Sequence, residues 1–299
     1  MKKYYNKALV VLMTMASACS GLLDQEAISN LTQQDFWKSR DDANAGLTAV
    51  YDGLQKTLGS DFLIWGDFRS DEVEFIEGES NPTPDHLLIM RDQLHPRLGP
   101  ANWSEFYNLI ARCNNLLSNV ASISDLTEGE KNNFLGQGYF IRALAYFYAV
   151  RIWGDVPLIL EPYTSSEDDF FVSRTPQNIV LSAIKDDLEE AVNKLPKSSS
   201  PNKGTWGGAM ALKAHVYAWE KDYNTVVSVT NELINSSIYH LVSTGNYRNI
   251  FESENTNESI FELVFDFNSY QEINGIADQF LAQPYSIGLS PRFQPSQSF

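Results

Sequence analysis

The side chains that most often carry out catalysis are present in this sequence, but their spacing forms no recognised catalytic pattern. Two carboxylate pairs, Glu72/Glu74 and Asp168/Asp169, have the residue type that glycosidases use as acid and base. A chain with 38 acidic residues contains many such pairs by chance, so we expect these to be solvated loop charges. The four histidines are scattered, and no pattern for a nucleophilic serine, a phosphate-binding loop or a zinc site occurs. The sequence therefore predicts a protein that is not an enzyme and that needs neither a metal nor a cofactor, which leaves a secreted glycosidase as a minor hypothesis.

Cys19 is the one residue whose position predicts a covalent modification. Lysines within the first seven residues precede an apolar run at 8–16, which is too short to cross a bilayer as a helix. Small residues then lead up to Cys19, an arrangement that resembles a bacterial lipobox, although Ala16 stands where leucine is usual. We therefore expect residues 1–18 to be a lipoprotein signal peptide and Cys19 to carry acyl chains, which hold a protein on a membrane without spanning it. The alternative is plain secretion with an incidental Cys19.

The charge balance argues against one class of partner, and the second cysteine argues against a disulfide. Acidic residues outnumber basic ones by 38 to 22, and the net charge of −16 argues against a nucleic-acid partner, because phosphate binding relies on Lys and Arg. Cys113 has no predicted partner if Cys19 carries lipid, so no disulfide is expected. Because Cys113 falls among apolar positions at helical spacing, we expect it to be a small buried side chain.

Helical periodicity dominates the chain and predicts a mainly α fold. Residues 211–234 form an expected helical hairpin with its turn at Lys221–Asp222, in the style of a tetratricopeptide repeat. Long irregular insertions, above all residues 59–100, and a little β structure at 259–267 complete the expected fold. The other expected helices cover residues 41–58, 103–117, 128–153 and 176–195.

The helix expected at 128–153 carries the clearest local signals. Thr127 and Glu130 have the spacing of a capping box at its start, and Gly154 begins the turn that ends it. Its residues are apolar nearly all round and include many small side chains, which is typical of a buried helix that neighbouring helices approach closely. Its aromatic residues are therefore expected to be core rather than a binding surface. The next helix is expected to be capped by Thr175.

Several stretches, in order, resemble the SusD/RagB family of outer-membrane lipoproteins of the Bacteroidetes. After Cys19 come "LLDQEAIS" and the pair Phe36–Trp37, followed by "NWSEFYNLIARCNNLL" and "GYFIRALAYFYAVRIWGDVPLI". The series continues with "RTPQNIVLSAIKDDLEEAVNKLP", "ALKAHVYAWEKDY" and "NESIFELVFDF". Each stretch is modest alone, but the ordered set is specific and covers essentially the whole chain after Cys19.

This resemblance implies both an architecture and a function. Family members have helical scaffolds with tetratricopeptide-like hairpins, lie lipid-anchored on the outer surface of the outer membrane, and cap a SusC-like TonB-dependent transporter. They bind glycans or other oligomers for uptake. Residues 19–299 would then form one SusD-like helical domain. Because family members are considerably longer, this domain is expected to lack part of its C-terminal half.

A glycan site needs exposed aromatic rings, which stack on the C–H faces of sugars, beside polar groups that bind hydroxyls. The resemblance favours the first irregular insertion for this role. The candidate ligand-binding residues are Trp65, Phe68, Arg69, Asp71, Phe75, Trp103 and Tyr285. Two alternatives remain open: Trp65 and Phe75 could be core beneath a loop, and Arg69 and Asp71 could form a structural ion pair. If every aromatic of this region were buried, a helical-repeat scaffold that binds a protein partner would be favoured instead.

Lipidation of Cys19 can be tested directly. Cells that express the chain and grow with radiolabelled palmitate should incorporate label into the wild type and not into Cys19→Ala, because only the cysteine thiol can accept the lipid. Equal labelling of the two proteins would contradict the assignment, and Cys113→Ala, which keeps Cys19, is the matched control.

Overall fold

The computed structural model describes residues 36–59, 61–70, 72–76, 84–165, 167–266, 275–276, 280 and 293–296. Two compact units are distinguished, Met1–Lys38 and Ser39–Phe299, and every element named below belongs to the second. Its helices are α3 (Arg40–Leu58), α4 (Asp61–Trp65), α5 (Pro84–Met90), α6 (Ser104–Asn119), α7 (Glu128–Trp153), α8 (Gln177–Lys194), α9 (Trp206–Trp219), α10 (Tyr223–Asn235) and α11 (Asn249–Glu252). Shorter elements are η2 (Asp67–Arg69), η3 (Gly99–Ala101), η4 (Val120–Ser122), η5 (Thr244–Asn246), β1 (Val73–Phe75) and β2 (Phe293–Pro295).

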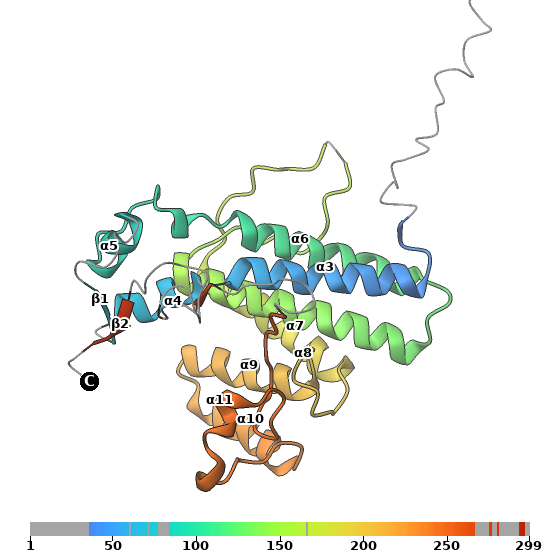
Figure 1. Ribbon diagram of the computed structural model, residues 1–299. Helices are drawn as coiled ribbons and strands as arrows, with labels where there is room; N and C mark the ends of the chain where they lie inside the picture. Colours follow the sequence, from blue (N-terminus) through green and yellow to red (C-terminus); the bar gives the residue numbers. More distant parts are fainter. Residues whose placement is uncertain are drawn as a thin grey trace, which may run out of the picture. The chain divides into compact units, whose positions relative to one another are not determined.

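Helix α7 is the central element of this unit, as Figure 1 shows. It packs against α6 on one side and α8 on another and also contacts α3, while α3 packs on α6. Helix α9 continues the series by packing on α8 and pairing with α10 in the predicted hairpin. The mainly α fold and the buried character of α7 are therefore confirmed. Within the described residues, no helix is both long enough and apolar enough to cross a membrane.

Glycines on α7 allow its neighbours to approach closely. A Cβ atom at Gly136 would lie 2.8 Å from Cγ of Leu195, and one at Gly138 would lie 2.9 Å from a methyl group of Leu117. Real Cβ atoms almost never come so close to another atom, so alanine at either position would push the neighbouring side chain away. Cys113 of α6 is completely buried in the same core, where burial raises the pKa of its thiol to about 12.

The ends of α7 are formed as the sequence predicts. The Thr127 hydroxyl accepts a hydrogen bond from the Glu130 backbone N–H, and the Glu130 carboxylate accepts one from the Thr127 backbone N–H, which completes the capping box. At the other end Gly154 adopts φ 71°, a conformation that favours glycine, and the helix stops.

The predicted cap of α8 is wrong. The backbone N–H of Thr175 donates to the carbonyl of Val156 at 2.9 Å, so Thr175 belongs to an isolated β-bridge. The first helical N–H, that of Gln177, instead donates to a carboxylate oxygen of Asp155 at 2.9 Å. The turn that ends α7 therefore also caps the start of α8, because the Asp155 carboxylate accepts a helical N–H that would otherwise lack a partner.

The predicted strand at 259–267 is also wrong over the residues that the structure describes. Residues 261–266 have no regular secondary structure. Their backbone makes single hydrogen bonds to separate partners instead of a ladder to one strand. The N–H of Glu262 donates to the Pro201 carbonyl at 2.9 Å, and the Gln55 amide donates to the Val264 carbonyl. These two groups of the apolar, aromatic run bond to a loop carbonyl and to a helix side chain, and the run pairs with no strand among the described residues.

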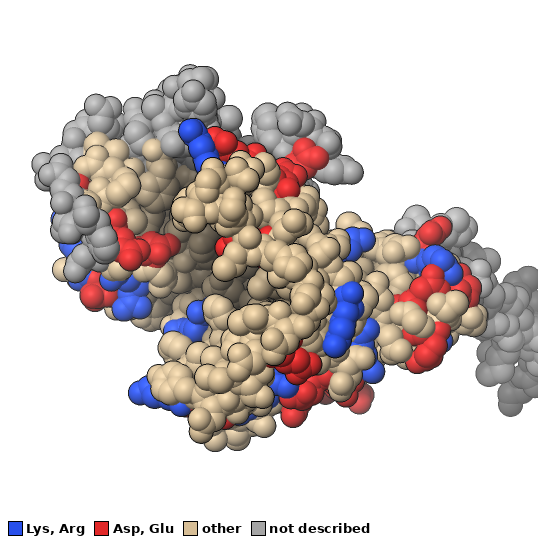
Figure 2. All heavy atoms as spheres, turned by 90° about the horizontal axis from the view of Figure 1, so that it is seen from below, with Lys and Arg blue, Asp and Glu red and all other residues tan. Residues whose placement is uncertain are grey.

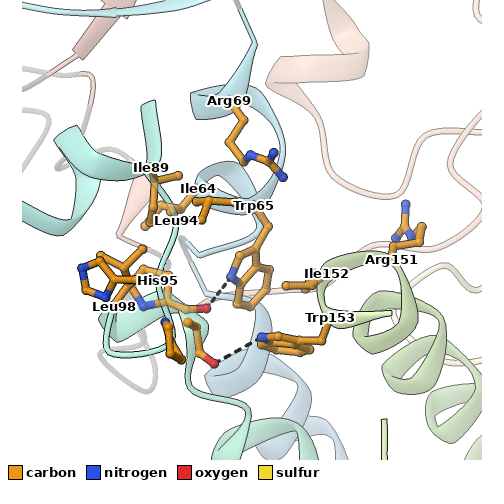
Figure 3. Close-up of a pocket in the computed structure, with 13 residues that line it drawn as sticks. Ile64, Trp65, Arg69, Ile89, Leu94, His95, Leu98, Arg151, Ile152 and Trp153 are labelled. Carbon is orange, nitrogen blue, oxygen red and sulfur yellow. Dashed lines mark hydrogen bonds between the residues drawn. The ribbon is translucent and has the colours of Figure 1, made fainter. Parts of the chain in front are cut away.

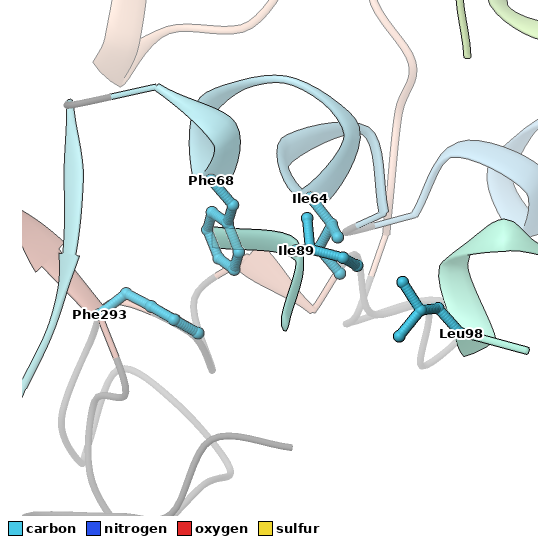
Figure 4. Close-up of a cluster of buried hydrophobic side chains, with 5 residues drawn as sticks. All are labelled: Ile64, Phe68, Ile89, Leu98 and Phe293. Atoms are coloured by element: carbon cyan, nitrogen blue, oxygen red, sulfur yellow. The ribbon is translucent and has the colours of Figure 1, made fainter. Parts of the chain in front are cut away.

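The insertion at 59–100 folds around a small core of its own. Strand β1 pairs antiparallel with β2, with Val73 opposite Pro295 and Phe75 opposite Phe293. Five buried side chains point toward one another beside this pair, and Figure 4 shows Ile64, Phe68, Ile89, Leu98 and Phe293. The insertion therefore consists of short elements packed on a shared apolar cluster, which gives the adjacent loop a fixed base.

Arg142, in the middle of α7, forms a buried polar network that joins three helices. Its Nε and Nη2 atoms donate to the two carboxylate oxygens of Asp187 on α8 at 2.8 and 2.7 Å. Its Nη1 atom donates to the side-chain oxygen of Asn114 on α6 at 2.8 Å and to the Leu160 carbonyl at 2.7 Å. Although burial alone favours the neutral form, the Asp187 carboxylate raises the pKa of Arg142 above its usual value. The network was not predicted from sequence.

Replacing Arg142 should destabilise the protein strongly. Arg142→Met leaves the Asp187 carboxylate buried without its cation, so we expect the free energy of unfolding in urea to fall by about 3–5 kcal/mol. The matched control is Arg69→Met, because Arg69 and Asp92 form an exposed ion pair with side chains 45% and 68% exposed, and its loss should cost less than about 1 kcal/mol.

A second substitution separates the lost charge pair from lost packing. Arg142→Met combined with Asp187→Leu removes both charges and should recover a large part of the stability. A double variant as unstable as Arg142→Met alone would show that packing, and not the uncompensated carboxylate, explains the loss.

Candidate functional site

A cavity of about 270 Å³ opens where the insertion meets the end of α7. Figure 3 shows side chains entering it from α4, from the loop after α5 and from the last turn of α7. Its described lining consists of Ile64, Trp65, Arg69, Ile89, Leu94, His95, Pro96, Leu98, Pro100, Ala101, Arg151, Ile152 and Trp153. An apolar, aromatic wall with a few polar groups is typical of a site for a small organic ligand.

Two tryptophans form the aromatic wall, and the short turn η3 fixes both. The indole N–H of Trp65 donates to the Pro100 carbonyl at 2.8 Å, and that of Trp153 donates to the Ala101 carbonyl at 3.2 Å (Figure 3). The two rings meet edge to face at 6.2 Å, and both contact Phe106 of α6. Because the N–H groups are already bonded, the rings are held in place and can offer their apolar surface to a ligand.

Two exposed arginines border the cavity. Arg69 donates through Nε and Nη2 to one carboxylate oxygen of Asp92, at 3.2 and 3.1 Å. Arg151 donates through Nε to the Phe147 carbonyl at 3.2 Å, and its guanidinium lies over the rings of Phe147 and Tyr148. Planar guanidinium groups can donate several hydrogen bonds at once to hydroxyls or anionic groups of a ligand.

The structure places three of the predicted residues as follows. Trp65 is partly exposed and lies in the cavity wall, and Arg69 is at its border with Asp92 as its ion-pair partner. Phe68 is only 1% exposed and packs on Phe293 with ring centroids 4.2 Å apart, so its ring presents no face to a ligand.

Two further candidates lie beside the cavity rather than in it. Phe75 is half-buried against the small core, which agrees with the alternative that it supports the loop. Trp103 is half-buried and meets Trp153 edge to face at 6.0 Å, while the guanidinium of Arg174 covers its ring at 4.7 Å. The remaining candidates, Asp71, Tyr285 and the lipidation residue Cys19, lie outside the described residues.

Arg151, Ile152 and Trp153 are lining residues that the sequence did not reveal. They belong to the apolar helix that was expected to be core. The apolar spacing of the sequence does not distinguish its last turn from the buried turns before it. The feature of the sequence that could have indicated them is their position directly before Gly154. The last turn of a helix often extends beyond the core, so its side chains can face a neighbouring loop.

Asp168 and Asp169, one of the two candidate catalytic pairs, have structural roles. Asp168 accepts hydrogen bonds from the backbone N–H groups of Ser165 and Thr164, which lower the pKa of its carboxyl, whereas a general acid needs a raised pKa. Asp169 accepts the backbone N–H of Phe171 at 2.9 Å. In the described part of the chain, no three His, Cys, Asp or Glu side chains gather as a metal site would require.

Comparisons with known proteins agree with the helical scaffold. The sequence profile of a family described as starch-binding and associating with the outer membrane matches residues 87–218. The SusD-like protein P38 of Formosa agariphila is 30% identical over 283 residues, which cover 89% of this chain and 55% of that protein. The chain belongs to the SusD/RagB family.

Solved SusD-like structures share the fold. A SusD superfamily protein from Bacteroides vulgatus superposes with a TM-score of 0.75 at 25% identity, over 88% of this chain and 57% of that one. A laminarin-binding SusD-like protein superposes with a TM-score of 0.65 at 28% identity, over 75% of this chain and 51% of that one. The chain spans about half the length of the SusD-like relatives that it matches.

Proposed function

We propose that this SusD/RagB protein is a lipid-anchored glycan-binding subunit on the outside of the outer membrane, where it works with a SusC-like TonB-dependent transporter in oligosaccharide uptake. Lipid on Cys19 would hold it at the membrane, in line with the family's description as associating with the outer membrane. The transporter partner and the outward orientation rest on resemblance to the family.

The observation that carries the proposal is the aromatic cavity between Trp65 and Trp153. Its rings are fixed by hydrogen bonds to η3, and its only charged or titratable described lining residues are Arg69, Arg151 and His95. Such a surface can stack on the C–H face of a sugar ring and bind its hydroxyls. It contains no described carboxylate pair that could cleave a glycosidic bond, so it supports binding in preference to hydrolysis.

The relatives give the ligand class. The family is described as starch-binding, and one solved structural neighbour is described as laminarin-binding, so both point to glucose-based glycans for those proteins. We infer that this chain also binds a glycan.

A protein-binding scaffold remains the second candidate, because α10 has an exposed apolar face. Tyr223, Val227 and Ile234 are 63%, 58% and 70% exposed on this helix. The aromatic residues of the insertion nevertheless favour glycan binding, since Trp65 and Trp103 are not fully buried.

Removing the ring of Trp65 should weaken glycan binding. The purified chain is titrated by calorimetry with hexasaccharides from starch, laminarin and polygalacturonic acid. Trp65→Leu, which keeps apolar bulk but has no flat ring, should raise the Kd of whichever glycan binds by about tenfold or more, as is typical for a tryptophan at the centre of an interface.

The matched control is Phe171→Ala, because this ring is 93% exposed and does not line the cavity. A thermal melt shows whether Trp65→Leu remains folded. Binding of none of the three glycans by the folded wild type, or equal Kd values for Trp65→Leu and wild type, would contradict the proposed site.

A further inference from the structure

The cavity carries positive charge on a strongly acidic protein. The chain has a net charge of −16, and Figure 2 shows acidic and basic side chains interspersed on the face that it displays. The described residues that line the cavity include Arg69 and Arg151 but no Asp or Glu. The charged side chains of the described lining are therefore opposite in sign to the net charge of the whole chain.

Arg151 is available to a ligand. Its only hydrogen bond to another described residue runs from Nε to the Phe147 carbonyl, one turn earlier in α7. The ion pairs among the described residues do not include Arg151. Because its guanidinium rests on the rings of Phe147 and Tyr148, its orientation is restricted while both Nη groups keep their donors.

Arg69 enters the lining of the same cavity from the insertion, and Figure 3 labels it together with Arg151. Among the described residues, Asp92 is the carboxylate that pairs with Arg69, and it accepts from Nε and Nη2 through a single oxygen. The Nη1 group accordingly keeps its donors for a ligand. The pair is exposed, so an anionic ligand group can compete with Asp92 at little cost.

A third guanidinium lies next to the same rings. Arg174 covers the Trp103 ring and donates to the backbone carbonyls of Trp153 and Asp155, at 3.3 and 2.9 Å. The Asp155 carboxylate itself is occupied at the start of α8, where it accepts the N–H of Gln177. Arg174 therefore adds a cation beside Trp153, and the Asp155 carboxylate in the same turn is an anion that binds the start of α8.

We propose that the cavity selects acidic glycans: sugar rings stack on Trp65 and Trp153 while a uronate carboxylate or a sulfate ester on the glycan binds Arg151 and Arg69. The inference rests on the proposed glycan-binding function and names its substrate class. A neutral glycan would offer the guanidinium groups only hydroxyl acceptors. A carboxylate or a sulfate ester offers an ionised acceptor that can take two parallel N–H bonds from one guanidinium, which makes the bond stronger.

The test compares acidic oligosaccharides with neutral counterparts of the same length. Hexagalacturonate is compared with its carboxyl-reduced form, and a sulfated carrageenan hexasaccharide with its desulfated form, by calorimetry on the purified chain. At least one acidic ligand should bind about tenfold or more tightly than its counterpart, because one hydrogen bond to a charged group is worth that factor. The pair that shows the difference tells carboxylate from sulfate, and the difference should shrink as salt is added.

Variants assign the effect to Arg151. Arg151→Gln should weaken the acidic ligand about tenfold while leaving the neutral one nearly unchanged, and Arg151→Lys should lie between, since it keeps the charge but loses the planar donors. The control is Arg248→Gln, which makes the same change in net charge at a side chain that is 84% exposed, lies outside the cavity lining and pairs with Glu252.

The outcomes separate the two proposals. Equal or tighter binding of the neutral counterparts, or the same loss of affinity in Arg248→Gln as in Arg151→Gln, would overturn acidic selectivity and leave glycan binding standing. Binding of no hexasaccharide, acidic or neutral, by the folded chain would overturn both proposals.

Discussion

The arrangement of the helices depends on one buried cation. Arg142 bonds both oxygens of Asp187 on α8, the Asn114 side chain on α6 and the Leu160 carbonyl in the segment after α7. An arginine buried in this way requires its acceptors, since an unpaired charge in a protein interior costs several kcal/mol. The bonds therefore restrict the register of α6, α7 and α8 in addition to apolar packing, because each guanidinium N–H needs its acceptor in a set direction.

That register determines where the far end of α7 lies. About three turns beyond Arg142, the helix ends at Trp153, and Gly154 and Asp155 turn the chain so that the Asp155 carboxylate caps α8. The end of α7 is thereby held from both sides. On the other side of the cavity, the small core around Phe68 supports α4 and η3. The carbonyls of η3 accept the indole N–H groups of Trp65 and Trp153. The cavity is therefore held between two separately packed parts of one unit.

The sequence predicted the helices well because their evidence is local. Apolar spacing, the Thr127–Glu130 capping box and Gly154 each act within a few residues, and the structure confirms them. The errors concern long-range partners: Thr175 bonds Val156, Asp155 caps a helix 22 residues later, and residues 259–266 pair with no strand in the described part of the chain. Periodicity contains no information about such partners.

Only part of the site was predicted, because the sequence shows residue types but not which residues pack together. Residue type singled out Trp65 and Arg69, which line the cavity, and Phe68, which does not. An aromatic residue in an irregular segment can serve either as core or as surface, and only the packing of Phe293 on Phe68 decides between them. Arg151 and Trp153 were missed because their side chains leave the core only at the end of a helix that is otherwise buried.

The most direct test of the account is to observe the tryptophans themselves while a glycan binds. With ¹⁵N-labelled tryptophan, each of the six indole N–H groups gives its own NMR signal, and single Trp→Phe variants assign them. Titration with hexagalacturonate and then with laminarihexaose should shift the Trp65 and Trp153 signals with at least one of the glycans. The signal of Trp206, buried in α9, should stay in place. A glycan that saturates the protein while the Trp65 and Trp153 signals remain unmoved would contradict the claim that this cavity is the binding site.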